Sequence, residues 1–122
     1  GGGLYVGSDN WPLQSESNQI TNRLYKKESF GNFEESIAQA SLKGNNLNLK
    51  ALKRIPAGNS TAAFPMDYRL KVEAWIADQP LILSGQVKKG RIIIDGGYSR
   101  FYCNVWKEIS AAILNEFLQF LD

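Results

Sequence analysis

Residues 91–106 read RIIIDGGYSRFYCNVW, and this stretch decides the fold that we predict. The run from Arg91 to Asp95 is short and apolar, as is typical of a buried strand, and it leads directly into the pair Gly96-Gly97. We expect a helix to follow, with its first turn near Ser99. A strand that runs through a glycine loop into a helix commonly holds an anion or polar ligand at the strand's carboxyl end. The stretch therefore predicts both an α/β arrangement and a ligand site.

The segments before this strand predict its neighbours in a sheet. Pro80 to Gln86 is a second apolar run, and the letters VKKG (87–90) join it to the strand that follows. Gly90 suits the turn of a hairpin. Further upstream, Arg69 to Ile76 alternates apolar and polar residues, with Leu70, Val72 and Ala74 on the face that we expect to be buried.

The last segment, Val105 to Leu121, carries the strongest helix signal in the chain. Its apolar residues follow a three-to-four spacing, while Lys107, Glu108 and Glu116 lie off that stripe. The pattern predicts an amphipathic helix that packs on the sheet. Its apolar face consists of Trp106, Ile109, Ile113, Phe117 and Phe120.

The beginning of the chain predicts another strand and a helix. Leu4 to Val6 is an apolar run ended by a glycine, and it delivers Asp9 and Asn10 to a loop. Pro12 suits the first turn of a helix that extends through Tyr25. The expected apolar face of this helix consists of Leu13, Ile20 and Leu24.

The middle of the chain gives weaker signals. Asn32 with Glu35 resembles a capping arrangement, so we expect a short helix or an irregular arm within residues 28–39. Residues 41–61 contain loosely alternating leucines before Pro56 and Gly58, which indicates an edge strand and then a long loop.

Composition limits the classes of function. The chain has 122 residues, 43% of them hydrophobic, which suits one globular domain over residues 1–122, either complete or a fragment of a longer protein. Fourteen basic and twelve acidic residues give a net charge of +2 and no basic stripe, so we expect no nucleic-acid partner. No apolar run is long enough to span a membrane, and no signal peptide is visible. We therefore expect a cytoplasmic protein without a membrane partner.

The chain contains no histidine. This excludes Ser-His-Asp and Cys-His catalysis and histidine-ligated zinc, and it removes the commonest general base near neutral pH. We expect no cofactor, no bound metal and, on balance, no enzymatic activity from this chain alone.

The residues after Asp95 form the first candidate site. Unpaired backbone amides at Gly96 and Gly97, the guanidinium of Arg100 and the hydroxyl of Ser99 are groups that hold a carboxylate or phosphate. The alternative is structural: the glycines serve only the turn, and Arg100 pairs with Asp95 as a latch.

Asp9 and Asn10 form a second polar cluster. If the first strand is parallel to the strand Arg91 to Asp95, both clusters open at the same edge of the sheet. Two carboxylates there could bind a divalent cation or divide acid and base roles. The letters DNWP (9–12) are also typical of a turn.

One cysteine and two tyrosines lie close to the predicted ligand site. Cys103 lies near the expected start of the last helix, where a thiol pKa is lowered, although a free cysteine is more often a small buried hydrophobe. Tyr98 and Tyr102 are expected to be partly exposed and to contact a ligand.

The segments GGGLYVGSDNWP (1–12) and PLILSGQVKKGRIIIDGGYSRFY (80–102) resemble the distal half of class I glutamine amidotransferase-like domains. The resemblance implies a flavodoxin-like α/β fold or a trimmed version of it, with a mixed sheet of four or five strands and the long C-terminal amphipathic helix. The chain lacks the G-x-C-x-G nucleophile elbow and the histidine of that family, and Cys103 follows the last strand. Amidotransfer by this chain alone is therefore not expected.

Three functions stay open from the sequence. The first is a non-catalytic domain that binds a small polar or anionic ligand, or a partner's loop, at the junction of strand, loop and helix. The second is an enzyme completed by a partner chain or a metal, and the third is a structural subunit that packs against another protein or another copy. The expected ligand-binding residues are Asp9, Asn10, Asp95, Gly96, Gly97, Tyr98, Ser99 and Arg100.

Overall fold

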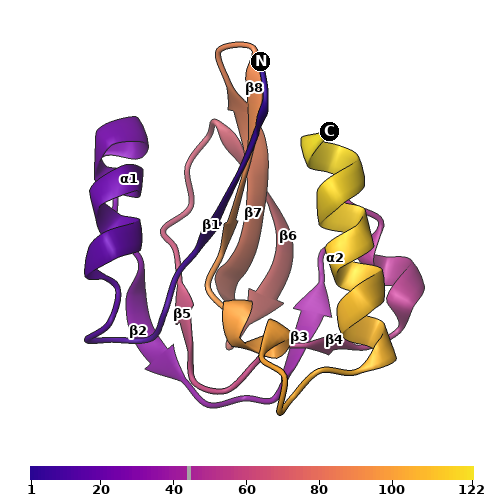
Figure 1. Cartoon of the computed structure of the whole chain (residues 1–122). Helices are drawn as coiled ribbons and strands as arrows, with labels where there is room; N and C mark the ends of the chain where they lie inside the picture. Colours follow the sequence, from indigo (N-terminus) through magenta and orange to yellow (C-terminus); the bar gives the residue numbers. More distant parts are fainter. Residues whose placement is uncertain (44) are drawn as a thin grey trace.

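The computed structural model describes residues 1–43 and 45–122. Within these residues the chain forms mainly strands, with an 11-residue helix near its beginning and a 14-residue helix at its end (Figure 1). In chain order the elements are β1 (Gly3–Gly7), α1 (Ser15–Tyr25), β2 (Phe30–Phe33), β3 (Ile37–Ala40), η1 (Leu49–Leu52), β4 (Ile55–Pro56), β5 (Thr61–Ala63), β6 (Leu70–Ile76), β7 (Gln79–Val87), β8 (Gly90–Asp95), η2 (Tyr98–Phe101) and α2 (Glu108–Leu121).

Six strands form one curled, mixed sheet in the order β1-β8-β7-β6-β3-β4. Only β1 and β8 pair in parallel, and every other neighbouring pair in this sheet is antiparallel. β2 and β5 form a separate antiparallel pair. The two helices lie on opposite sides of the strands (Figure 1).

This architecture overturns the flavodoxin-like expectation. A flavodoxin-like domain needs a parallel sheet whose strands alternate with crossover helices. Here β6, β7 and β8 follow one another through tight turns, so they can pair only in antiparallel fashion. The structure is a six-stranded half-barrel with one long and one short helix, and the expected sheet of four or five strands is wrong.

The elements with strong local signals lie where the sequence predicts them. β7 and β8 form the expected hairpin, in which Val87 is opposite Gly90. β8 is buried on both faces: Ile92 and Ile94 face the core on the α1 side, and Ile93 faces the core beneath α2. Burial of one such side chain contributes roughly 1.5–3 kcal/mol. α2 packs on the sheet as expected, with Ile113 and Phe117 buried.

The prediction for the α1 face is confirmed only at Leu24, which packs against the core on the α1 side, and is wrong at its other two residues. The buried residues of α1 are Ser17, Thr21 and Tyr25, whereas Leu13 before the helix and Ile20 within it are exposed. The small side chains bring α1 close to the loop after β1, where Ser17 Oγ donates to Ser8 Oγ at 3.0 Å. Pro12 lies in the turn before the helix, which begins at Ser15.

The middle of the chain also differs from its prediction. Residues 28–39 contain β2 and the start of β3, so the expected helix or irregular arm is wrong. Residues 41–61 contain the short elements η1 and β4, and β5 starts at Thr61. These strands are two to four residues long, too short for their own sequence to show a strand periodicity, and partners distant in the sequence stabilise them.

A register shift in β6 changes one expected face. The pairing with β7 is irregular between Val72 and Ala74, and this brings the charged Glu73 into the interior. The Glu73 carboxylate accepts hydrogen bonds from Ser84 Oγ at 2.6 Å and from the backbone N–H of Leu47 at 3.2 Å. Glu73 therefore fastens the segment before η1 to the sheet.

Candidate functional site

The carboxyl ends of β1 and β8 lie side by side, as the sequence predicts for parallel strands. Gly7 is opposite Asp95 in the register, and the N–H of Ser8 donates to the Asp95 carbonyl at 2.8 Å. Both predicted polar clusters therefore lie at the same edge of the sheet. Their side chains, however, differ sharply in accessibility.

The Asp95 carboxylate is completely buried. One oxygen accepts a hydrogen bond from the N–H of Gly97 at 2.8 Å, and the other accepts one from the Tyr5 hydroxyl at 2.8 Å and another from Arg100. Burial, followed by the negative charge of Asp95, raises the pKa of Tyr5 well above its usual range. Tyr5 therefore stays a neutral hydrogen-bond donor at physiological pH.

The Arg100 guanidinium is also fully enclosed. Its Nη1 group pairs with Asp95, its Nε donates to the Pro56 carbonyl at 2.8 Å, and its Nη2 donates to the Ala57 carbonyl at 3.3 Å. All three guanidinium nitrogens thus have partners within the protein. The pairing expected of the structural latch is present, and it fastens the segment after β4 to the end of β8.

The glycine pair is packed against backbone. A Cβ atom at Gly96 would lie 1.8 Å from the Ala62 carbonyl oxygen, and one at Gly97 would lie 2.0 Å from the Ala57 carbonyl oxygen. The N–H of Gly96 donates to the Leu81 carbonyl at 2.9 Å. The absent side chains at these positions are explained by close backbone approach.

Ser99 is buried and bonded at both its donor and its acceptor. Its Oγ accepts from the N–H of Asn59 at 2.8 Å and donates to the Asn59 carbonyl at 3.2 Å. The secondary structure around Ser99 differs from the prediction. Tyr98 to Phe101 form only the single turn η2, and α2 begins at Glu108, so the expected helix start near Ser99 is wrong.

The accessible part of the predicted site is a hydrogen-bonded chain of three side chains. The Tyr102 hydroxyl donates to the Tyr98 hydroxyl at 2.7 Å, and Tyr98 donates to the Asp9 carboxylate at 3.2 Å. The second Asp9 oxygen accepts from the N–H of Asn10 at 2.8 Å. Tyr102 is exposed and the other three are half-buried, which confirms the expected partial exposure of the tyrosines. We call Asp9, Asn10, Tyr98 and Tyr102 the tyrosine–aspartate cluster.

The electrostatics of this cluster follow from its geometry. The hydrogen bond with Tyr102, then burial and the negative charge of Asp9, raise the pKa of Tyr98 above its ordinary value. Tyr98 therefore stays a neutral hydrogen-bond donor at physiological pH, and the centroids of the Tyr98 and Tyr102 rings lie 5.4 Å apart in an edge-to-face contact. The cluster therefore presents one carboxylate, one amide, two hydroxyls and two aromatic rings.

Cys103 differs from both of its predicted environments. It is exposed, so it is not a buried hydrophobe, and it lies in the turn before α2 and not at the helix start. The part of the chain that the structure describes contains no group of three or more cysteine, aspartate or glutamate side chains that could hold a metal ion.

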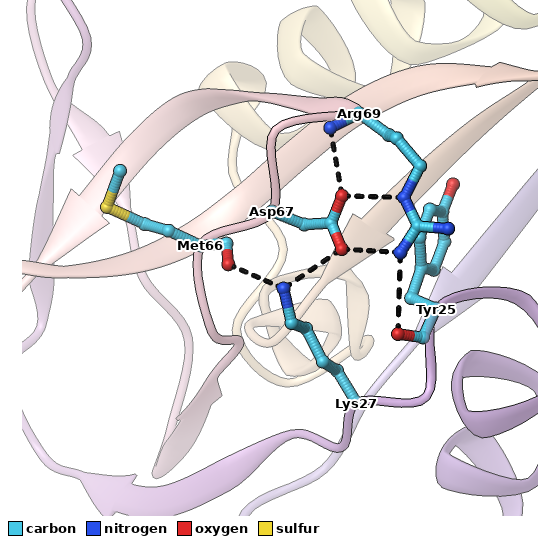
Figure 2. A network of polar contacts seen from close by, with 5 residues as sticks. All are labelled: Tyr25, Lys27, Met66, Asp67 and Arg69. Atoms are coloured by element: carbon cyan, nitrogen blue, oxygen red, sulfur yellow. Dashed lines mark hydrogen bonds and ion pairs between the residues drawn. The ribbon is translucent and has the colours of Figure 1, made fainter.

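Figure 2 shows a second polar network, centred on Asp67, which the sequence pattern does not predict. Asp67 accepts hydrogen bonds from Arg69 Nε at 2.9 Å and Nη2 at 2.7 Å, and from Lys27 Nζ at 3.0 Å. Arg69 Nη2 also lies 3.5 Å from the Tyr25 carbonyl oxygen. These bonds hold the pKa of Asp67 well below its usual range, mainly through Arg69. The network fastens the end of α1 to the turn before β6.

Comparison with known proteins identifies no family for this chain. No family model matches it, and no curated protein matches it. The amidotransferase resemblance thus stays a prediction without support at the family level. The flavodoxin-like fold that it implies is wrong, as the sheet topology shows. Among the helices of the described residues, none is long and apolar enough to cross a membrane.

One solved structure shares the fold. It is described as the cytoplasmic protein STM1381 from Salmonella typhimurium LT2, and it matches with a TM-score of 0.73 at 13% sequence identity. The match covers 100% of this chain but 56% of that chain, so this chain spans little more than half the length of its structural neighbour. At this identity the likeness shows the fold alone.

Proposed function

We propose that this chain is a non-catalytic binding domain whose ligand contacts the tyrosine–aspartate cluster. The observation that carries the proposal is the hydrogen-bonded chain Tyr102–Tyr98–Asp9, which is accessible at the carboxyl ends of β1 and β8. Ligands of α/β proteins commonly bind beyond the carboxyl ends of parallel strands. A cytoplasmic location belongs to this proposal, and its support is the description of the structural neighbour.

The hydrogen-bond order favours a particular ligand chemistry. Tyr102 donates to Tyr98 and Tyr98 donates to Asp9, so both hydroxyl protons are used within the cluster. The Asn10 side-chain amide donates to the Trp11 carbonyl at 3.1 Å and keeps one free N–H. Apart from that N–H, what remains for a ligand is acceptor capacity and the negative charge of Asp9. The Arg100 guanidinium, which the sequence predicts as an anion contact, is buried against Asp95. We therefore propose a ligand that donates hydrogen bonds, such as an amine, a guanidinium or a partner's loop bearing one, in preference to an anion.

The alternatives lack a comparable observation. The enzyme alternative uses Asp9 or Asp95 as acid, base or ligand. Asp95 is fully buried and paired, and Asp9 accepts hydrogen bonds from Tyr98 and from the N–H of Asn10. The role of a structural subunit stays a prediction from the sequence. A melting temperature that rises with protein concentration would indicate it.

Arginine amide and acetate are suitable probes because they carry opposite charges. In a titration followed by backbone amide resonances, we expect arginine amide to shift residues 9–10 and 98–102, and acetate to leave them unchanged. Asp9→Asn and Tyr98→Phe should weaken that binding about tenfold, the size expected for loss of one hydrogen bond to a charged group.

Asp78→Asn is the matched control, because Asp78 is an exposed aspartate in the β6–β7 turn without polar contact to the cluster. It should leave the titration unchanged. Acetate binding at these residues, or arginine amide binding that survives Asp9→Asn, would contradict the proposal.

A further inference from the structure

A cavity of about 430 Å³ opens where α2 begins, beside β3 and β4. Its lining comes from three segments that are distant in the sequence: the start of β3, the turn between η1 and β4, and the first residues of α2. It shares no lining residue with the tyrosine–aspartate cluster. A volume of this size lies within the range of small-molecule sites, roughly 300–1,000 Å³.

One part of the lining is apolar. It consists of Ile37 from β3, Leu52 and Pro56 from either side of the turn, and Ile109 from the first turn of α2. Leu52 and Ile109 are half-buried and pack against the core beneath α2. Pro56 is also half-buried, and Ile37 is exposed. This surface suits a small apolar group, since covering it removes apolar area from water on both sides.

The other part of the lining is cationic. Lys53, Arg54 and Lys107 line the same cavity and no acidic residue does. All three side chains are exposed, and none of them forms an ion pair or a side-chain hydrogen bond with the residues 1–43 and 45–122 that the structure describes. Glu35 and Glu108 neighbour lining residues in the sequence but are not themselves part of the lining. Three basic residues that line one cavity, without an ion-pair partner in the described part of the chain, favour an anion.

The backbone that presents two of these cations is strained. The N–H of Arg54 donates to the Leu52 carbonyl at 2.7 Å, and Lys53 between them has φ 65° and ψ −41°. These values describe a γ-turn of the rare kind that costs energy for a residue with a side chain. Such strain is often found where a fold holds ligand-binding groups in place. Here the turn holds Lys53 and Arg54 on one wall of the cavity.

We propose that this cavity binds a small organic anion. The apolar part of the ligand lies against Leu52, Pro56 and Ile109, and its phosphate or carboxylate group contacts Lys53, Arg54 and Lys107. The guanidinium of Arg54 can hold either head group through two parallel hydrogen bonds, and the lysines add charge. This site is independent of the proposed function at the tyrosine–aspartate cluster, because neither its residues nor its ligand charge is shared.

Phenyl phosphate is the probe that tests both parts of the site. Titration followed by backbone amide resonances should shift residues 36–37, 52–56 and 107–109, with an affinity at least tenfold above those of inorganic phosphate and of phenol. Rising salt should weaken the binding, because the cations are exposed. Benzoate in place of phenyl phosphate decides which head group the site prefers, and binding of either one at these residues supports the proposal.

Two variants and one control locate the contact. Arg54→Gln and Lys53→Gln should each weaken phenyl phosphate about tenfold, the loss expected for one hydrogen bond to a charged group. Lys50→Gln should leave the affinity unchanged, because Lys50 is an exposed lysine of η1 that does not line the cavity. Lys53→Gly should raise the melting temperature, because glycine adopts the positive φ without strain, and should still weaken phenyl phosphate binding. If the turn served only the fold, the same variant would leave the affinity unchanged.

Three results would overturn the proposal. The first is that neither phenyl phosphate nor benzoate binds at millimolar concentration. The second is an affinity no higher than that of the matching anion without the ring, inorganic phosphate or acetate, since the apolar lining would then contribute nothing. The third is binding that Arg54→Gln and Lys53→Gln leave unchanged, which would place the anion elsewhere on the surface.

Discussion

Asp95 and Arg100 form an ion pair in which neither side chain has any exposure to solvent. The two residues lie five positions apart along the chain. Their other partners are Tyr5 of β1 and the carbonyls of Pro56, which ends β4, and Ala57, which follows it. Three distant segments therefore meet at one buried charge pair. A buried pair of this kind is costly to break, because the remaining partner keeps its charge without compensation.

We expect Arg100→Ala to lower the free energy of unfolding by about 3–5 kcal/mol, because it leaves the Asp95 carboxylate buried and unpaired. Urea denaturation measures this loss. Arg23→Ala, which removes an exposed arginine of α1, should change stability by less than about 0.5 kcal/mol. The double variant Arg100→Met with Asp95→Leu should lose less than the sum of its single changes. Equal effects of Arg100→Ala and Arg23→Ala would refute the latch.

Asp67 predicts an acid dependence of stability. Its folded-state pKa lies below the unfolded value of about 3.9, so its contribution is fully present above that pH and is lost as pH falls toward the folded-state pKa. Asp67→Asn should therefore flatten the decline of stability below about pH 4. Because Lys27 and Arg69 are partly exposed, high salt should reduce the difference between the two proteins. Identical acid profiles for the variant and the parent would contradict this role.

Gly96 has no space for a side chain. In Gly96→Ala the new Cβ would meet the Ala62 carbonyl oxygen at 1.8 Å, so backbone must move, and we expect a loss of about 1–3 kcal/mol. Gly2→Ala is the control, because a Cβ there would meet no atom within 4 Å. Thermal melts of the two variants should separate clearly. If Gly96→Ala melts together with Gly2→Ala, the packing at the end of β8 is not as described.

The two helices should respond differently to truncation of an isoleucine. Ile113→Ala in α2 removes a fully buried side chain and should cost about 2–5 kcal/mol. Ile20→Ala in α1 truncates a side chain that is 39% exposed, and we expect it to cost less than about 1 kcal/mol. Urea denaturation of the pair tests the correction of the α1 face. A cost for Ile20→Ala that matches that of Ile113→Ala would restore the face expected from the sequence.

The accuracy of the sequence-based predictions depends on how local each signal is. The β7–β8 hairpin and α2 were predicted because their apolar runs and spacing lie within one segment. In β6 the expected face of Leu70, Val72 and Ala74 is confirmed. The predictions fail at Glu73 of β6 and Ser17 of α1, because both are buried through partners elsewhere in the chain. Nothing near Pro56 or Ala57 in the sequence indicates that their carbonyls accept hydrogen bonds from Arg100.

By itself the sequence determined the strand β8, its hairpin with β7, the amphipathic helix α2 and the position of polar residues after β1 and β8. Each depends on the period of apolar residues or on glycine, which acts over a few positions along the chain. Only the tertiary structure decided that the sheet is largely antiparallel, that Asp95 and Arg100 are buried, and that Lys53, Arg54 and Lys107 line one cavity. The physical reason is that strand pairing and burial depend on contacts between distant segments, which no local pattern specifies.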